Sequence, residues 1–255
     1  MTMTQAVISG AVQGITEFFP ISSSGHLVIL HHLFGLREPQ VAFDIFLHLG
    51  TLGAIFVFFR SDIAALFGKK NKLAVPVVLA TAVTFTIAFI FKDKFERCFD
   101  MPKVVGYMLI VTGAWLIAAT LYSRRAGKRE KKSEPGMLSS LLVGIAQGIA
   151  VMPGISRSGA TIATGMLAGL SREAAFRFSF LLAVPAILGA CLFKAHKIGS
   201  HFAAADAPQF AIGAATAMMV GLVSIKALLE LVKGNKLHFF GIYCFFAGLL
   251  TIMLA

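Results

Sequence analysis

The sequence predicts an all-α membrane protein that crosses the bilayer several times. Of its 255 residues, 57% are hydrophobic and 14% are charged, and the mean hydropathy is +0.82. A soluble domain carries roughly 25% charged residues. Several apolar runs approach the ~20 residues that a helix needs to cross a bilayer. A third observation is an internal duplication, which relates the two halves of the chain as an inverted repeat.

The two copies of the duplication read QGITEFFPISSSGH at residues 13–26 and QGIAVMPGISRSGA at residues 147–160. At a constant offset of 134 residues they share seven identities, four of which are glycine or serine rather than common apolar residues. We interpret the chain as a single integral membrane domain, residues 1–255. Within it, repeat 1 covers about residues 3–122, a basic cytoplasmic linker covers 123–136, and repeat 2 covers about 137–255.

Six apolar runs predict full transmembrane helices, at residues 41–59, 73–91, 104–122, 178–193, 209–225 and 239–255. The duplicated segments predict a different structure, because each is an apolar arm, a break rich in Pro, Gly and Ser, and a second short arm. An arm of ~15 helical residues rises only ~22 Å, which is less than the ~30 Å hydrocarbon core. Each segment is therefore expected to form a re-entrant helix–break–helix hairpin, at residues 3–36 and 137–170. Broken backbone at membrane depth is tolerated where it is buried or lines a wet cavity.

Basic residues in the connections predict the orientation of the chain. If the first hairpin enters from outside, the cytoplasmic connections hold thirteen Lys and Arg and the opposite ones hold seven. The tract RRAGKREKKSE, residues 124–134, supplies six of the thirteen and favours the cytoplasm. Three spans separate the hairpins, so the second enters from the opposite face. The two breaks are then expected to meet near the midplane, an arrangement typical of secondary transporters.

The formal net charge of +11 does not indicate a nucleic-acid partner, because the basic residues lie in short connections between apolar runs. Membrane lipids are the expected surroundings, and a homodimer is left open. Cys98, Cys191 and Cys244 lack metal-ligand spacing, so they predict neither a disulfide framework nor a zinc site.

The two breaks are candidate anion sites. Residues 22–25 read SSSG, residues 156–159 read SRSG, and an apolar helix follows each. Free N–H groups and the positive dipole end of a helix start attract anions, and glycine lets the backbone approach a ligand closely. Ser22 and Ser156 could instead only cap their helices. Arg157 favours a functional site, since ionisable side chains are costly inside a membrane. The candidate pyrophosphate-binding residues of the breaks are Ser22, Ser24, Gly25, Gly154, Ser156, Ser158 and Gly159.

Glu17 and Gln13 lie four residues apart, on one face of the arm before the first break. A carboxylate and an amide oxygen can hold Mg²⁺ or Ca²⁺, with substrate phosphate completing the shell. Glu17 could also act as a general base or simply neutralise Arg157. The second copy has Val151 at the position of Glu17 and Arg157 at that of Ser23. This complementary divergence favours an enzyme over a symmetric pore.

His26 lies three residues after Ser23, in the first turn of the following helix. An imidazole there could activate Ser23, attack phosphorus itself or protonate a leaving group. The nucleophile is therefore left open between Ser23, His26 and water.

Other polar residues in apolar runs are expected to be structural. Asp44 and His48, four residues apart, are expected to pair with each other or with Arg177. His31 and His32 are expected to be solvated near the membrane surface.

These motifs resemble those of the bacterial undecaprenyl-pyrophosphate phosphatase family, of the bacitracin-resistance type. QGITE at residues 13–17 resembles its (Glu/Gln)-x-x-x-Glu motif, and PGISRSGAT at residues 153–161 resembles its Pro-Gly-x-Ser-Arg-Ser-x-x-Thr motif. The resemblance covers nearly the whole chain. It implies hydrolysis of the lipid carrier pyrophosphate to the monophosphate and inorganic phosphate, which recycles the carrier for cell-wall synthesis and confers bacitracin resistance. It also implies a divalent cation and a site open to the outer face of the bacterial inner membrane.

The resemblance further implies that Glu17, Ser23, His26 and Arg157 are the principal catalytic residues, and it adds Thr161 to the pyrophosphate site. Many members have Glu where this chain has Gln13, whose amide supplies no second negative charge to the metal ligands Gln13 and Glu17. The leading alternative is a transporter or flippase for a phosphorylated isoprenoid lipid. A receptor that only binds an anionic lipid would leave Glu17 and His26 without a role.

Overall fold

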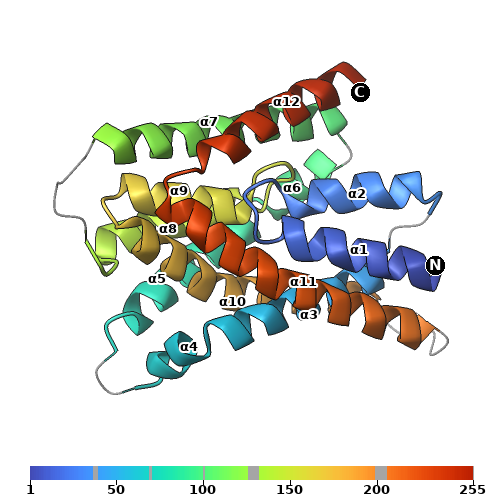
Figure 1. Ribbon diagram of the computed structural model, residues 1–255, viewed down its shortest axis with the longest axis horizontal. Helices are drawn as coiled ribbons and strands as arrows, with labels where there is room; N and C mark the ends of the chain where they lie inside the picture. The colour runs from blue at the N-terminus through green and yellow to red at the C-terminus, as the bar shows by residue number, and fades with distance from the viewer. Residues whose placement is uncertain (37–39, 69–70, 100, 126–131, 199–205, 255) are drawn as a thin grey trace.

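The computed structural model describes residues 1–36, 40–68, 71–99, 101–125, 132–198 and 206–254. Within these residues the regular structure is helical apart from an isolated bridge between Lys132 and Leu170, which confirms the predicted all-α class (Figure 1). The helices are α1 (Met3–Thr16), α2 (Ser23–Leu33), α3 (Val41–Phe58), α4 (Arg60–Leu66), α5 (Ala74–Ile90), α6 (Lys92–Phe99), α7 (Pro102–Arg125), α8 (Met137–Ile149), α9 (Arg157–Leu167), α10 (Arg172–Ile198), α11 (Ala207–Lys233) and α12 (His238–Leu254).

Each of the six predicted spans coincides with a helix, and the chain is a multi-pass membrane protein. Among the described residues, α3, α7, α10 and α11 are long and apolar enough to cross a membrane. The helix α5 reaches that length only together with α6, from which it is bent by 71°. The apolar helix α12 has 17 residues, so it is shorter than the full span predicted there.

Both duplicated segments fold as two short helices joined by a break, as predicted. The helices α1 and α8 have 14 and 13 residues, and α2 and α9 have 11 each, so all four are too short to span. In Figure 1 the hairpin of α1 and α2 opens toward the N-terminal end of the molecule, whereas α8 and α9 lie toward the opposite end. The two breaks therefore meet in the middle.

The two halves of the chain pack in equivalent ways. The first hairpin packs through α1 on α11, and the second packs through α8 on α5, so each hairpin is supported by a helix of the other half. Glycines at matching positions make both contacts close. A Cβ on Gly10 would lie 2.5 Å from the Gly213 carbonyl oxygen, and one on Gly144 would lie 2.7 Å from that of Ala80. The last helices of the two halves, α7 and α12, also pack together. The repeat boundaries stay a prediction.

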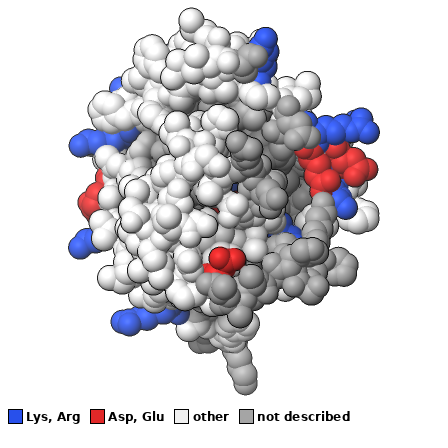
Figure 2. All heavy atoms as spheres, turned by 90° about the vertical axis from the view of Figure 1, so that its right-hand side faces the viewer, with Lys and Arg blue, Asp and Glu red and all other residues white. Residues whose placement is uncertain are grey.

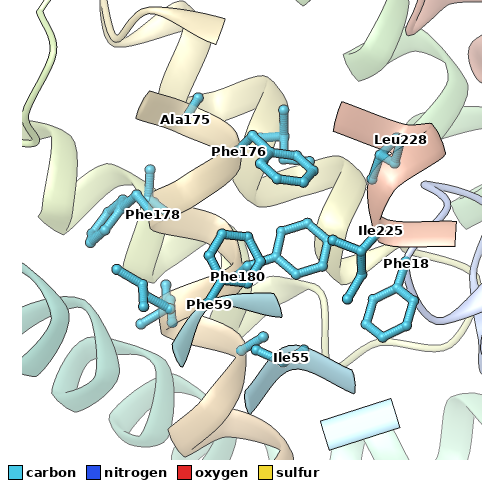
Figure 3. Close-up of a cluster of buried hydrophobic side chains, with 14 of the residues drawn as sticks. Phe18, Ile55, Phe59, Ala175, Phe176, Phe178, Phe180, Ile225 and Leu228 are labelled. Atoms are coloured by element: carbon cyan, nitrogen blue, oxygen red, sulfur yellow. The ribbon is translucent and has the colours of Figure 1, made fainter. Parts of the chain in front are cut away.

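The first break is anchored in the main hydrophobic core (Figure 3). Phe18 is fully buried, with its ring centroid 5.6 Å from that of Phe180 on α10. The Phe180 ring in turn lies 4.6 Å from Phe176 and 5.3 Å from Phe59. Because Phe18 directly follows Glu17, this aromatic packing fixes the backbone that carries the Glu17 carboxylate.

The surface agrees with a membrane setting. Large apolar side chains are exposed on several helices, for example Leu33 at 75%, Phe89 at 83% and Met253 at 82%. Figure 2 looks at the end of the molecule where α1 begins. Most of the described atoms there belong to uncharged residues, with an acidic side chain inside the face and other charged ones around its margin. Exposing such apolar side chains to water is unfavourable, whereas contact with lipid carries no such free-energy penalty.

Candidate active site

Glu17, at the end of α1, joins the two breaks. Its Oε1 accepts a hydrogen bond from Nη2 of Arg157 on α9 at 2.6 Å, and its Oε2 accepts one from the Ser23 hydroxyl at 2.7 Å. The Glu17 side chain is only 7% exposed and that of Arg157 only 16%. Charge-assisted bonds of this kind are the strong ones, and burial strengthens them further. The structure therefore brings together three of the four predicted catalytic side chains.

Gln13 and His48 flank the Glu17 carboxylate. Gln13 Nε2 donates to Oε2 at 3.1 Å, which confirms that the two side chains share a helical face. His48 of α3 places its Nε2 3.7 Å from the same oxygen. Its Nδ1 lies 2.7 Å from the Asp44 carbonyl oxygen, which can only accept, so Nδ1 carries a proton. His48 thus bonds to Asp44 as expected, but through the backbone, and its other nitrogen faces the site.

Among the neighbouring polar residues, one of the two alternative pairings and one expectation are wrong. Arg177 forms its ion pair with Asp62 rather than with Asp44 or His48. His31 is not solvated, because it is 8% exposed and its Nε2 lies 3.9 Å from Oδ1 of Asp44. Phe43 and Asp44 of α3 lie beside this imidazole, with the Phe43 ring centroid 6.4 Å from that of His31, and single-helix reasoning could not show these neighbours.

The first break turns sharply at Ser22. Its φ of 69° is unusual for a residue with a Cβ, and its side chain makes no capping bond to α2. His26 follows in the first turn of α2, with Nδ1 2.8 Å from the Ser22 carbonyl oxygen and Nε2 2.6 Å from the hydroxyl of Tyr243. Both ring nitrogens of His26 are thus occupied, and the Ser23 hydroxyl bonds to Glu17 instead.

The second break is held rigidly by α7. Gly154 has a φ of 93°, and a Cβ there would lie 2.4 Å from the Val105 carbonyl oxygen, so only glycine fits. The Thr112 hydroxyl donates to the Gly154 carbonyl at 3.1 Å and accepts from the Ser156 N–H at 3.2 Å. Ser156 also caps α9, because its hydroxyl accepts from Gly159 N–H at 3.1 Å. The simple capping interpretation therefore holds for Ser156 but not for Ser22.

The remaining predicted binding residues line the two helix starts. Ser24 lies 3.5 Å from Ser22, and Ser158 lies 3.2 Å from Ser156, measured between hydroxyl oxygens. The breaks touch where a Cβ on Gly159 would lie 3.1 Å from Pro20 Cβ.

Gly25 and Thr161 are placed differently with respect to the breaks. Gly25 lies in the first turn of α2, where a Cβ would make only an ordinary contact, so space does not demand glycine there. Thr161 is fully buried, 2.6 Å from the Ser179 hydroxyl of α10. It therefore fastens α9 to α10.

Two buried polar atoms of the site have no hydrogen-bond partner among the described residues, Nη1 of Arg157 and Oε1 of Gln13. Buried polar groups are almost always paired, so both atoms are available to a ligand or to water. The guanidinium nitrogen suits a phosphate oxygen, and the amide oxygen suits a cation. The described residues contain no group of three or more His, Cys, Asp or Glu that could hold a metal. The Glu17 and Gln13 oxygens fit a divalent cation only if phosphate oxygens complete its shell.

Sequence reasoning missed three contacts of the site, those made by His48, Thr112 and Tyr243. Tyr243 is 217 residues from His26 in the chain, and nothing in the spacing of these residues indicates contact.

Arg157→Met should lower the free energy of unfolding by about 3 kcal/mol, because it leaves the Glu17 carboxylate buried without a counter-charge. Adding Glu17→Gln should recover most of that loss, since a neutral amide needs no counter-charge. The midpoint of thermal unfolding of the purified protein in detergent measures both effects.

Arg177→Met is the matched control, because Arg177 is 47% exposed and pairs with Asp62 near the surface. It should cost less than about 1 kcal/mol. A double variant that unfolds at no higher temperature than Arg157→Met would contradict the buried pairing.

Comparison with known proteins shows the family to which the chain belongs. Three similar chains are named undecaprenyl-diphosphatase. The relative from Carboxydothermus hydrogenoformans is 40% identical, covering 100% of this chain and 98% of the relative. That from Desulforapulum autotrophicum is 38% identical over 99% and 98% of the two chains, and that from Methanosphaera stadtmanae is 39% identical over 100% and 99%. The family model described as bacitracin resistance protein BacA matches residues 6–250, and the chain belongs to this family.

Proposed function

We propose that the protein hydrolyses undecaprenyl pyrophosphate to undecaprenyl phosphate and inorganic phosphate. The activity would recycle the lipid carrier for cell-wall synthesis and so confer bacitracin resistance. The observation that carries the proposal is the Glu17 carboxylate, which holds the Ser23 hydroxyl and the Arg157 guanidinium across the two breaks. Membership of the family and the names of the relatives support the same activity.

Substrate binding uses the groups that the breaks leave unpaired. The isoprenoid tail stays in lipid, against the exposed apolar flanks, while the pyrophosphate enters between α2 and α9. Arg157 offers its unpartnered Nη1 to a phosphate oxygen. The N–H groups at the starts of α2 and α9 supply further donors and a favourable dipole. These groups neutralise the charge that builds up on the phosphoryl group in the transition state.

Ser23 is the nucleophile that the geometry favours. Its hydroxyl already donates to Glu17 at 2.7 Å, within the reach of a general base. Oγ attacks the terminal phosphorus, its proton passes to Glu17, and the bond to the bridging oxygen breaks as undecaprenyl phosphate leaves. Water then attacks the phosphoserine, and the bond from Ser23 Oγ to phosphorus breaks as Oγ takes back the proton held by Glu17. The proton lost by the water passes to the freed Glu17 carboxylate and then to solvent, and inorganic phosphate departs. His26 contributes from the first turn of α2, through its bond to the Ser22 carbonyl.

A divalent cation, Mg²⁺ or Ca²⁺, is part of the proposal. Glu17 and the unpartnered Oε1 of Gln13 would hold it together with phosphate oxygens. When bound, such a cation offsets negative charge on the phosphates. Because this chain supplies one carboxylate and one amide, we expect weak binding of the cation without substrate.

The proposed location is the bacterial inner membrane, with the site open to the outer face. Basic residues support this orientation, because the tract at residues 124–134 favours the cytoplasm. The hairpin of α1 and α2 opens at the end of the molecule opposite the end of α7 and the start of α8, which flank that tract (Figure 1).

A transporter or flippase for a phosphorylated isoprenoid lipid is the second candidate. The equivalent packing of the hairpins, α1 on α11 and α8 on α5, favours it, because crossed repeats suit alternating access. Transport alone, however, gives no reason for a serine hydroxyl bonded to a buried carboxylate.

The purified protein in detergent should release inorganic phosphate from a polyprenyl pyrophosphate. Ser23→Ala and Glu17→Gln should each slow release by about a hundredfold or more, because they remove the nucleophile and its base. Arg157→Lys should slow phosphate release by a similar factor, because the point charge of lysine does not reproduce the two-pronged donor geometry of the guanidinium.

Ser224→Ala is a matched control. The buried Ser224 hydroxyl donates to the Val220 carbonyl within its own helix, α11, and so the variant should keep the full rate. Absence of phosphate release under any metal condition would favour transport or binding. If Ser23→Ala releases phosphate at the wild-type rate, the nucleophile is water or His26 rather than Ser23.

Removing divalent cations with a chelator should abolish phosphate release, and adding Mg²⁺ or Ca²⁺ should restore it. Gln13→Glu should lower the cation concentration for half-maximal rate on the order of tenfold, because it adds a second carboxylate. Gln147→Leu is the control, since Gln147 also has a buried, unpartnered Oε1 but stands at the matching position of the other hairpin. An unchanged rate in chelator would rule out the cation.

Orientation can be measured by labelling single cysteines with a membrane-impermeant maleimide, in a variant lacking Cys98, Cys191 and Cys244. Thr4→Cys, at the exposed start of α1, should react in intact cells. Ser133→Cys, next to the basic tract, should react only after lysis. The reverse pattern would place the site on the cytoplasmic side.

A further inference from the structure

His26 and Tyr243 form a hydrogen-bonded chain with the first break. Nδ1 of His26 lies 2.8 Å from the Ser22 carbonyl oxygen, which can only accept, so Nδ1 carries the proton. In a neutral imidazole Nε2 is then an acceptor, and the Tyr243 hydroxyl donates to it at 2.6 Å. The chain runs in one direction, from the tyrosine hydroxyl through the imidazole to the Ser22 carbonyl. Such chains polarise and strengthen their members.

The residue at the end of this chain is strained. Ser22 has a φ of 69°, a conformation that a residue with a Cβ rarely adopts and that needs support from its surroundings. Ser22 immediately precedes Ser23, whose hydroxyl must point at Glu17. A bond that fixes the Ser22 carbonyl therefore also fixes the direction of Ser23.

Tyr243 is itself rigidly placed by α12. The adjacent Cys244 donates through Sγ to the Pro20 carbonyl at 3.4 Å, and Phe240 packs its ring 5.0 Å from Phe19. The tyrosine ring also stacks on His26, with centroids 5.9 Å apart and planes inclined by 19°. On its other side, α12 is pressed onto α7, where a Cβ on Gly113 would lie 2.6 Å from the Gly241 carbonyl.

We propose that Tyr243 is a positioning residue that acts through His26 to hold the strained Ser22 turn and so aim Ser23 at Glu17. His26 is also a positioning residue, and it contacts the break directly. The group that performs this role is its Nδ1–H, which donates to the Ser22 carbonyl. The proposal rests on the phosphatase function proposed above, and it assigns to the last helix of the chain a part in orienting the nucleophile. Because neither side chain needs to touch the substrate, loss of the chain should affect turnover rather than binding.

The first test is kinetic. Tyr243→Phe keeps the stacked ring and removes only the hydroxyl, so kcat should fall about three- to tenfold while KM changes less than about twofold. In a His26→Ala background the same substitution should have no further effect, because the residue through which it acts is gone. His26→Asn retains a donor near the position of Nδ1 and should recover much of the rate that His26→Ala loses.

Tyr122→Phe is the matched control, since Tyr122 is 40% exposed on α7, close to the 44% of Tyr243, and it should leave kcat unchanged. Two outcomes would overturn the proposal. One is an equal loss from Tyr243→Phe in both backgrounds. The other is a His26→Asn enzyme as slow as His26→Ala, which would make His26 a group that takes part in the chemistry.

The second test does not depend on activity. Nitrogen NMR of the ¹⁵N-histidine-labelled protein, at about pH 8 where ordinary histidine is neutral, should show His26 protonated at Nδ1. Its Nε2 resonance should shift in Tyr243→Phe and not in Tyr122→Phe. A proton on Nε2, or an unshifted resonance, would overturn the proposal even if His26→Ala is too slow to measure. If the wild type releases no phosphate, the phosphatase function fails while this spectrum still tests the hydrogen-bond chain.

Discussion

The buried pair of Glu17 and Arg157 is the interaction on which the rest of the site depends. Each residue comes from a different hairpin, and the carboxylate also receives the Ser23 hydroxyl. An unpaired charge at this depth would be costly, so each hairpin stabilises the other. The pair therefore holds the two breaks together without a ligand, and it leaves Nη1 of the guanidinium unpartnered and available to the phosphate of the proposed substrate.

Close backbone packing makes this pairing possible. The breaks can meet only because α1 lies directly against α11, and α8 against α5, with glycines at the contacts. Phe18 then locks the carboxylate-bearing end of α1 into the aromatic core around Phe180. The second break needs a different support, because it carries no large aromatic residue. Thr112 supplies that support by bonding both sides of the turn.

The sequence predicts the six helices at its long apolar runs, both hairpins and the shared face of Gln13 and Glu17, because each of these follows from periodicity or local spacing. It does not predict α4 and α6, which lie in segments that the sequence suggests are connections. The duplication also predicts that Glu17 and Arg157 approach each other. His48 and Tyr243 could not be predicted in the same way, since their contacts depend on how α3 and α12 rotate about their axes when they pack. The backbone of Ser22 is a similar case, because a positive φ is expected of glycine and the preceding residues give no sign of it.

The crossed support of the hairpins has a consequence for biogenesis. Neither hairpin rests on helices of its own half alone, since α1 needs α11 and α8 needs α5. While the ribosome is still making the second half, the first hairpin lacks α11, on which α1 packs, and Glu17 lacks the Arg157 guanidinium. Assembly of the site therefore requires that the chain has been inserted as far as α11 (Ala207–Lys233). A chain truncated before α11 would carry every catalytic candidate and still have no assembled centre.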